Sequence, residues 1–326
     1  MVVMGEASFG GPRVDSSMSA RLVAIVAVAT LGWCSDRSRP TSDPRTASNA
    51  CGDSAAVSWH PAAPRQGALF RVRVSAAPAA AELSGDVAGE PLHFTVVADT
   101  PAVAESFAAV PIDAGDTLGI VVRCSAAGRT DSLHARLEPA GGAYPLERLR
   151  VAPTFGRPPD SVLAARIRRE SERAAAVAGQ SHETPHLWSE PFVRPRTSRI
   201  TSGFGRGREF NGTVTSRHMG TDFAGAPGAP VRAANRGVVR IVDAFYYGGN
   251  VVYVDHGGGL TSAYLHLSRQ LVAEGDTVTR GQVIGRVGAT GRVTGPHLHL
   301  IVRYGRVTVD PMSLFAIAGD SAVQVP

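Results

Sequence analysis

Short segments in which apolar and polar residues alternate recur along most of this chain, and turns rich in glycine and proline separate them. Alternation with period two places side chains on opposite faces of a β-strand, whereas a helix needs a period near 3.6. In the first half of the chain the pattern occurs at residues 69–74, 92–98, 118–124 and 132–137. Several short strands at this spacing predict a small immunoglobulin-like β-sandwich over residues 51–155.

Glycine and β-branched residues dominate the second half of the chain. Runs that predict strands lie at residues 237–243, 250–255, 260–266, 283–287 and 298–302. The glycine-rich turns between these runs favour antiparallel pairing. We therefore expect an antiparallel β domain over residues 200–319 and a short tail at residues 320–326.

One helix is predicted between the two β regions, within a linker at residues 156–199. Asp160 or Ser161 can cap a helix that runs to about residue 178. Its many charged residues predict a solvated linker helix, and the proline- and serine-rich stretch after it predicts an extended linker. The expected fold class is therefore mainly β, with a linker helix between an N-terminal sandwich and a C-terminal sheet.

The first 50 residues predict export. Residues 22–31 (LVAIVAVATL) form an apolar run that is long enough for a signal-peptide core and too short to span a bilayer. We expect a signal segment at residues 1–34, with Met18 as an alternative start, and a flexible tether at residues 35–50. Cys34 follows the run as the lipid-bearing cysteine of a lipoprotein does, whereas the bulky Trp33 does not suit such a site. Lipid anchoring at Cys34 stays open, and the expected location is the periplasm or cell envelope.

The charge of the chain narrows the choice of partners. All 33 basic residues are arginine, and the formal net charge is +5. No stripe of arginine with interleaved aromatic residues is present, so nucleic acid is not an expected partner. Residues 274–285 are similar to the hairpins of biotinyl and lipoyl carrier domains, but those domains need an acceptor lysine and this sequence has none.

For the oligomeric state, we expect a monomer.

Two further cysteines lie within the predicted sandwich. They are Cys51 and Cys124. We expect them to form a disulfide, because two cysteines within one domain commonly pair in an oxidising compartment. Two separate buried thiols remain the alternative.

Histidines gather in the C-terminal domain in a pattern that suits a metal site. His297 and His299 are two apart in a predicted strand, so their side chains lie on one face. His218 and Asp222 add a nitrogen and an oxygen from another segment, and His266 lies in a third. Two nitrogens and one oxygen with an open position are typical of catalytic zinc, whereas magnesium and calcium prefer oxygen ligands. His256 is interpreted as a turn residue and not as a ligand.

Six motifs occur in one order between residues 200 and 315, and together they resemble the lysostaphin/LytM-type zinc endopeptidases of bacterial cell walls. The motifs are Ser202-Gly-Phe-Gly205, His218-x-x-x-Asp222, Gly228-Ala-Pro-Val231, Tyr264-x-His266-Leu267, Gly288-Ala-Thr-Gly291 and Thr294-Gly-Pro-His-Leu-His299.

This resemblance implies residue roles and a reaction. His218, Asp222 and His299 would be the ligands of one zinc ion. His266 and His297 would flank the metal-bound water as general base and transition-state stabilisers. The implied substrate is a peptide crosslink or bridge of peptidoglycan, with a D-Ala crosslink as the first choice over a glycine bridge. A tyrosine near the metal is left unassigned among Tyr246, Tyr247 and Tyr264.

Two alternatives are weighed against this interpretation. Noncatalytic relatives that bind the wall and activate another hydrolase have lost metal ligands, whereas this sequence keeps all of them. A different class of zinc peptidase also ends its site with two histidines but places an acidic residue shortly before them as the base. Residues 291–296 contain no acid, so the mechanism with two histidines is the better fit.

Overall fold

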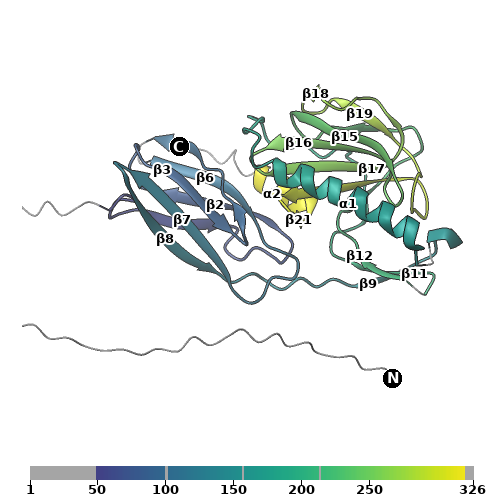
Figure 1. Cartoon of the computed structure of the whole chain (residues 1–326), viewed down its shortest axis with the longest axis horizontal. Helices are drawn as coiled ribbons and strands as arrows, with labels where there is room; N and C mark the ends of the chain where they lie inside the picture. Colours follow the sequence, from purple (N-terminus) through teal and green to yellow (C-terminus); the bar gives the residue numbers. More distant parts are fainter. Residues whose placement is uncertain (1–48, 100–101, 156–157, 213, 320–326) are drawn as a thin grey trace, which may run out of the picture. The chain divides into compact units, whose positions relative to one another are not determined.

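The structure, a computed structural model, describes residues 49–319 apart from residues 100–101, 156–157 and 213. The predicted signal segment, most of the tether, Cys34 and the tail lie outside the described residues. No helix within the described part of the chain is long and apolar enough to cross a membrane. The predicted fold class is confirmed, because strands make up most of the regular structure (Figure 1).

The N-terminal part consists of two antiparallel sheets of four strands each, which share one core. The first sheet has the order β1 (Ala56–His60), β2 (Leu69–Ser75), β6 (Ala102–Ala109), β5 (Thr95–Asp99). The second has the order β4 (Glu90–Pro91), β3 (Glu82–Val87), β7 (Leu118–Ala126), β8 (Arg129–Leu137). Phe70 and Val72 of β2 pack with Val122 of β7 in the shared core. The strand order agrees with that of immunoglobulin-type sandwiches.

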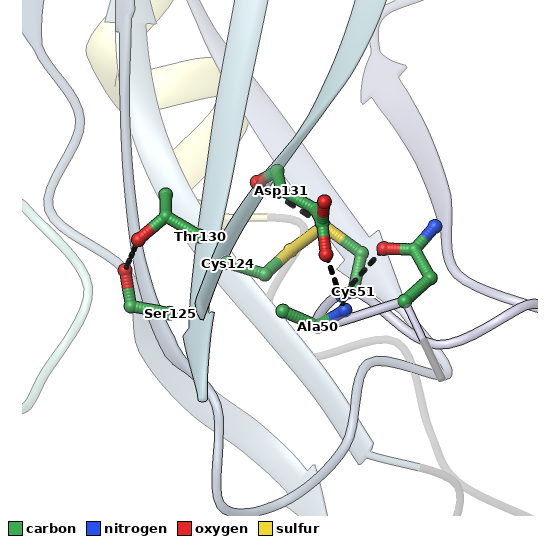
Figure 2. The surroundings of a disulfide bond; sticks show 7 residues. Ala50, Cys51, Cys124, Ser125, Thr130 and Asp131 are labelled. Carbon is green, nitrogen blue, oxygen red and sulfur yellow. Dashed lines mark hydrogen bonds between the residues drawn. A yellow bond between two sulfur atoms is a disulfide. The ribbon is translucent and has the colours of Figure 1, made fainter. Parts of the chain in front are cut away.

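A disulfide ties the start of the described chain to this sandwich (Figure 2). Cys51 pairs with Cys124 on β7, and their Cα atoms are 5.0 Å apart. The backbone N–H of Ala50 donates to the Asp131 carboxylate at 2.7 Å, which holds the same segment against β8. The alternative of two separate thiols is thereby excluded.

The C-terminal part is built on an antiparallel sheet of ten strands. Its main path runs in the order β10 (Ile200–Ser202), β13 (Thr221–Ala224), β20 (His297–Tyr304), β17 (Leu260–Gln270), β16 (Gly249–Gly257), β15 (Gly237–Phe245), β18 (Thr277–Val278). Three more strands pair off this path: β14 (Pro230–Arg232), β19 (Val283–Val287) and β21 (Val307–Val309). The helix α2 (Pro311–Gly319) follows β21. Leu314 of α2 packs in one apolar cluster with Leu69 of the sandwich strand β2.

The helix α1 (Ser161–Gln180) packs on the C-terminal sheet and is not a solvated linker as predicted (Figure 1). Asp160 caps it as expected, because its carboxylate accepts the N–H of Leu163 at 2.8 Å. Ala174 is buried against Ile241 of β15 and Val251 of β16. The sequence pattern did not reveal this narrow apolar face, because charged residues dominate the helix and its buried residues are small alanines, which add little to the apolar periodicity.

A short strand before the linker helix joins the C-terminal part instead of the sandwich. β9 (Leu146–Leu149) lies within residues 51–155, yet it pairs in parallel with β11 (Gly207–Phe210). β11 pairs in turn with β12 (Val214–Arg217), which completes a three-stranded sheet. A 3-10 turn at Pro153–Phe155 follows β9. The last strand of this small sheet, β12, ends directly before the first candidate ligand, His218.

Candidate metal centre

Three predicted ligands meet where β13 and β20 pair. Asp222 of β13 and His299 of β20 are direct partners in the strand register, and His218 lies just before β13. His299 Nδ1 is 2.7 Å from Asp222 Oδ1, and His218 Nε2 is 3.0 Å from the same oxygen. The two imidazole nitrogens are 2.9 Å apart. All three side chains are buried, so their donor atoms form a compact group that could hold a metal ion.

The glycine between the first two ligands allows this close approach. A Cβ atom at Gly220 would lie 2.7 Å from Cε1 and Nε2 of His299. Real Cβ atoms essentially never come so near another heavy atom, so a larger residue would displace the His299 ring.

Hydrogen bonds orient the ligands. The Nδ1 atom of His218 lies 2.8 Å from the carbonyl of Gly203, which can only accept, so Nδ1 carries the proton and Nε2 has its lone pair toward the group. Arg208 donates to Asp222 Oδ2 at 2.7 Å, which leaves Oδ1 toward the histidines. Such outer contacts fix the tautomer and direction of metal ligands.

The protonation states suit metal binding. Burial would raise the pKa of Asp222, but the close contacts of its carboxylate with His218 and His299 outweigh burial and hold that pKa well below its usual range. Burial lowers the pKa of His299 to about 4, against the opposing effect of Asp222. A carboxylate and neutral imidazoles are the forms that bind metal. The set of two nitrogens and one oxygen fits zinc.

His266 is placed beside the group by a β-bulge. Leu265 and His266 of β17 together oppose the single residue Val251 of β16, and His266 has a φ of 63°. Bulges with a residue in this left-handed conformation re-aim a side chain. The His266 ring lies 4.9 Å from the His297 ring and 5.7 Å from the His299 ring, between centroids. Burial, then His299 and His297, hold the pKa of His266 well below its usual range.

In both remaining histidines, His266 and His297, one ring nitrogen can still accept a proton. Nδ1 of His266 lies 2.9 Å from the carbonyl of Thr290, and Nδ1 of His297 lies 2.8 Å from the carbonyl of Gly295. Each carbonyl fixes the proton on Nδ1, so Nε2 is the basic atom of each ring. Nε2 of His297 is 3.6 Å from Asp222 Oδ1. The structure thus brings together all five residues singled out in the sequence.

Of the three candidate tyrosines, Tyr247 shares a hollow with the group. It lines a hollow of about 170 Å³ together with His218, His266 and His299. Tyr264 is fully buried, and its hydroxyl accepts the N–H of Ala234 at 2.7 Å inside the domain. Tyr246 packs against Phe155 instead.

His256 is not a turn residue, which corrects the prediction. It belongs to β16 and is fully buried. Its Nδ1 atom lies 2.7 Å from the carbonyl of Arg236, and its Nε2 atom lies 2.8 Å from the hydroxyl of Ser262. It has a structural role, and it is not among the residues of the candidate metal group.

A cleft of about 330 Å³ lies beside the group, and Asp222 and His297 line it. Sequence reasoning missed the other charged residues of its wall. Arg208 also faces Glu147 of β9, with Nε 3.5 Å from the carboxylate. The remaining charged residues of the wall are Arg199 and Arg292. None of these stands in a spacing pattern, so no local signal could have found them.

The fold and the donor set together are those of a β domain with a candidate metal site. Residues 216–311 match the profile of peptidase family M23. The C-terminal part of the chain is therefore an M23 metallopeptidase domain of the LytM/lysostaphin type, which confirms the resemblance seen in the motifs.

Individual relatives agree with this assignment. Peptidoglycan DD-endopeptidase ShyA of Vibrio cholerae is 50% identical over 110 residues, which are 32% of this chain and 25% of ShyA. ShyB of the same organism is 45% identical over 117 residues, which are 35% of this chain and 27% of ShyB. A solved structure of a candidate M23 peptidase from Pseudomonas aeruginosa aligns with a TM-score of 0.60 at 25% identity, over 78% of this chain and 96% of that one. The chain thus spans about a quarter of the length of the two curated relatives.

Proposed function

We propose that this protein is a zinc-dependent endopeptidase that hydrolyses peptide crosslinks or bridges of bacterial peptidoglycan. The observation that carries the proposal is the buried group of His218, Asp222 and His299, with two further histidines beside it, inside an M23 domain. The names of ShyA and ShyB describe DD-endopeptidases of peptidoglycan, which supports a D-Ala crosslink as the first substrate to test.

His218, Asp222 and His299 would hold the zinc ion. When bound, zinc polarises the scissile carbonyl and makes water a nucleophile near neutral pH. Arg208 neutralises the carboxylate oxygen of Asp222 that faces away from the histidines, and it fixes the direction of that side chain.

His266 and His297 would move the protons of the reaction. Because a backbone carbonyl holds the Nδ1 proton of each ring, Nε2 can accept a proton from the attacking water and later give it to the leaving amine. A protonated Nε2 is also a donor to a developing oxyanion. The close approach of the two rings, 4.9 Å between centroids, lets both act on one substrate group.

The disulfide supports the location. Structural disulfides persist in oxidising compartments such as the periplasm, and Cys51–Cys124 lies in the sandwich of the same chain. We propose an exported protein of the cell envelope, with domain limits as predicted except that β9 belongs to the peptidase part.

A digest of purified peptidoglycan tests the proposal. Residues 47–326, loaded with zinc, are compared with their His299→Ala variant, because the described residues of this part belong to one compact unit. New muropeptides from the zinc-loaded protein alone are expected, and their masses name the bond. Intact walls after treatment with zinc-loaded protein, with several crosslink types offered, would point to the alternative of a noncatalytic activator.

A further inference from the structure

The cleft beside the metal group contains two arginines without a carboxylate partner. Arg199 and Arg292 line the cleft together with Asp222 and His297. Among the described residues, neither guanidinium makes an ion pair with a carboxylate. Arg208 differs from both, because it is paired with Asp222 at 2.7 Å and with Glu147 at 3.5 Å. Two cationic groups in the wall of the cleft are therefore available to a ligand.

Two aromatic rings hold Arg292 in place, although no described carboxylate pairs with it. Its Cζ atom lies 4.1 Å from the ring centres of both Phe210 and Tyr247. Its backbone N–H donates to the carbonyl of Tyr247 at 2.9 Å. Aromatic rings stabilise the face of a guanidinium and leave its N–H edge free to donate. Phe210 comes from β11, so the small sheet that β9 completes helps to fix this arginine.

The position of Arg292 favours the binding of an anion beside it. Its side chain is half-buried, and a partly desolvated cation without a counter-ion is costly. The cleft wall has three arginines against two carboxylates, Glu147 and Asp222. A carboxylate that binds in the cleft would neutralise the extra positive charge. It would also accept two parallel hydrogen bonds from the planar guanidinium of Arg292.

We propose that Arg292, with Arg199, forms a carboxylate-binding subsite that selects crosslinked peptides with a free carboxylate beside the scissile amide. The inference rests on the proposed endopeptidase function and adds its substrate class. Peptides that lack this carboxylate, such as glycine bridges or amidated crosslinks, are then poor substrates. Arg292 is a specificity-determining residue and takes no part in bond cleavage.

The test uses one crosslinked muropeptide in three forms: unmodified, amidated at the carboxylate next to the scissile bond, and amidated only at the distant chain end. The zinc-loaded protein should cleave the first and third forms with a kcat/KM about 10- to 100-fold above that of the second. Arg292→Gln should lower kcat/KM on the unmodified peptide to the level of the second form, mainly through KM, and leave the second form unchanged. Arg292→Lys should restore part of the preference.

Arg269→Gln is the matched control, because Arg269 is exposed and is not part of the cleft wall. This variant should keep the full preference. Equal cleavage of the unmodified peptide and the form amidated next to the scissile bond would overturn the subsite. A loss in Arg292→Gln that is equal on these two peptides would also overturn it.

Binding separates the subsite from the proposed function. If the zinc-loaded protein cleaves no peptidoglycan, the endopeptidase function fails, and calorimetry with the His297→Ala protein then judges the subsite alone. Tighter binding of the unmodified peptide than of the form amidated next to the scissile bond, lost in the His297→Ala/Arg292→Gln protein, would support the subsite. Equal affinities would overturn it.

Discussion

His297 and His299 lie on the same face of β20, yet their contacts give them different roles. His299 Nδ1 faces Asp222 and His218 directly, whereas Nδ1 of His297 bonds a backbone carbonyl. We expect His299→Ala to lose bound zinc. His297→Ala should keep about one zinc per chain but cleave about 10²- to 10⁴-fold more slowly. Metal analysis and cleavage rates on the same samples check both results, and wild-type turnover by His297→Ala would refute the assigned role.

Arg208 acts on the metal group through Asp222. Arg208→Gln removes the charged donor at Asp222 Oδ2, 2.7 Å away. We expect about 10- to 100-fold weaker zinc binding, measured by competition with a chelator of known affinity. Arg206→Gln is the control, since the Arg206 side chain contacts Glu147 at 3.2 Å, and its contact with His218 is made by the backbone carbonyl, which the substitution keeps. If both variants bound zinc as tightly as the wild type, Arg208 would have no positioning role.

His256 should make stability depend on pH. Burial lowers its folded-state pKa to about 4, against about 6.5 in the unfolded chain. The free energy of unfolding is therefore highest above about pH 6.5, where His256 is neutral in both states. It falls below that pH because the unfolded chain binds a proton more readily than the folded one, and it levels off below about pH 4. The total loss is about 3 kcal/mol.

Urea unfolding at pH 7 and pH 4.5 measures this effect, with a chelator present so that metal release does not contribute. His256→Gln should show a smaller loss between the two pH values than the wild type. Equal losses in the two proteins would assign the acid sensitivity to other groups.

At the scale of elements, α1 is held by its small apolar face. Ala174 is buried at 4% exposure against β15 and β16, while Ala176 on the same helix is exposed. Ala174→Asp buries a carboxylate without a partner and should lower the free energy of unfolding by about 3 kcal/mol or more. Ala176→Asp should change it by less than about 0.5 kcal/mol. Thermal and urea unfolding check both variants, and similar small effects would mean that α1 is a solvated linker after all.

The bulge in β17 is the element feature that matters most for the site. A regular strand would turn every second side chain to the same face, so Tyr264 and His266 would share one. The extra residue breaks this alternation: Tyr264 lies in the core and His266 lies beside His297. The spacing of the Tyr-x-His motif does not reveal this difference.

At the scale of the whole molecule, the disulfide closes a long loop across the sandwich. Cys51 and Cys124 are 73 residues apart, and the chain-entropy model assigns about 4 kcal/mol to a loop of this length. The Cys51→Ala/Cys124→Ala protein should therefore unfold at a lower urea concentration, with its zinc content unchanged because the metal group lies in the other part of the chain.

A reducing agent is the control for this prediction. It should shift the unfolding midpoint of the wild type and leave that of the double variant unchanged. No difference between wild type and double variant in the absence of reductant would mean that the disulfide does not stabilise the sandwich.

Local patterns in the sequence were sufficient to predict the β character of the chain and the residues of the candidate metal group. Alternation is a property of neighbouring residues, and His218/Asp222 and His297/His299 are close in the sequence, so local spacing already suggests a shared face. Family motifs joined the separate segments into one site.

The other features depend on contacts between residues far apart in the chain, so they become visible only in the folded protein. β9 pairs with β11 about 60 residues later, α1 finds its apolar partner on β15 and β16, and His256 is buried by strands that enclose it. Arg208 and Arg292 are two of 33 basic residues, and nothing local distinguishes them. Their environment, a carboxylate for Arg208 and two aromatic rings for Arg292, exists only once the sheets have assembled.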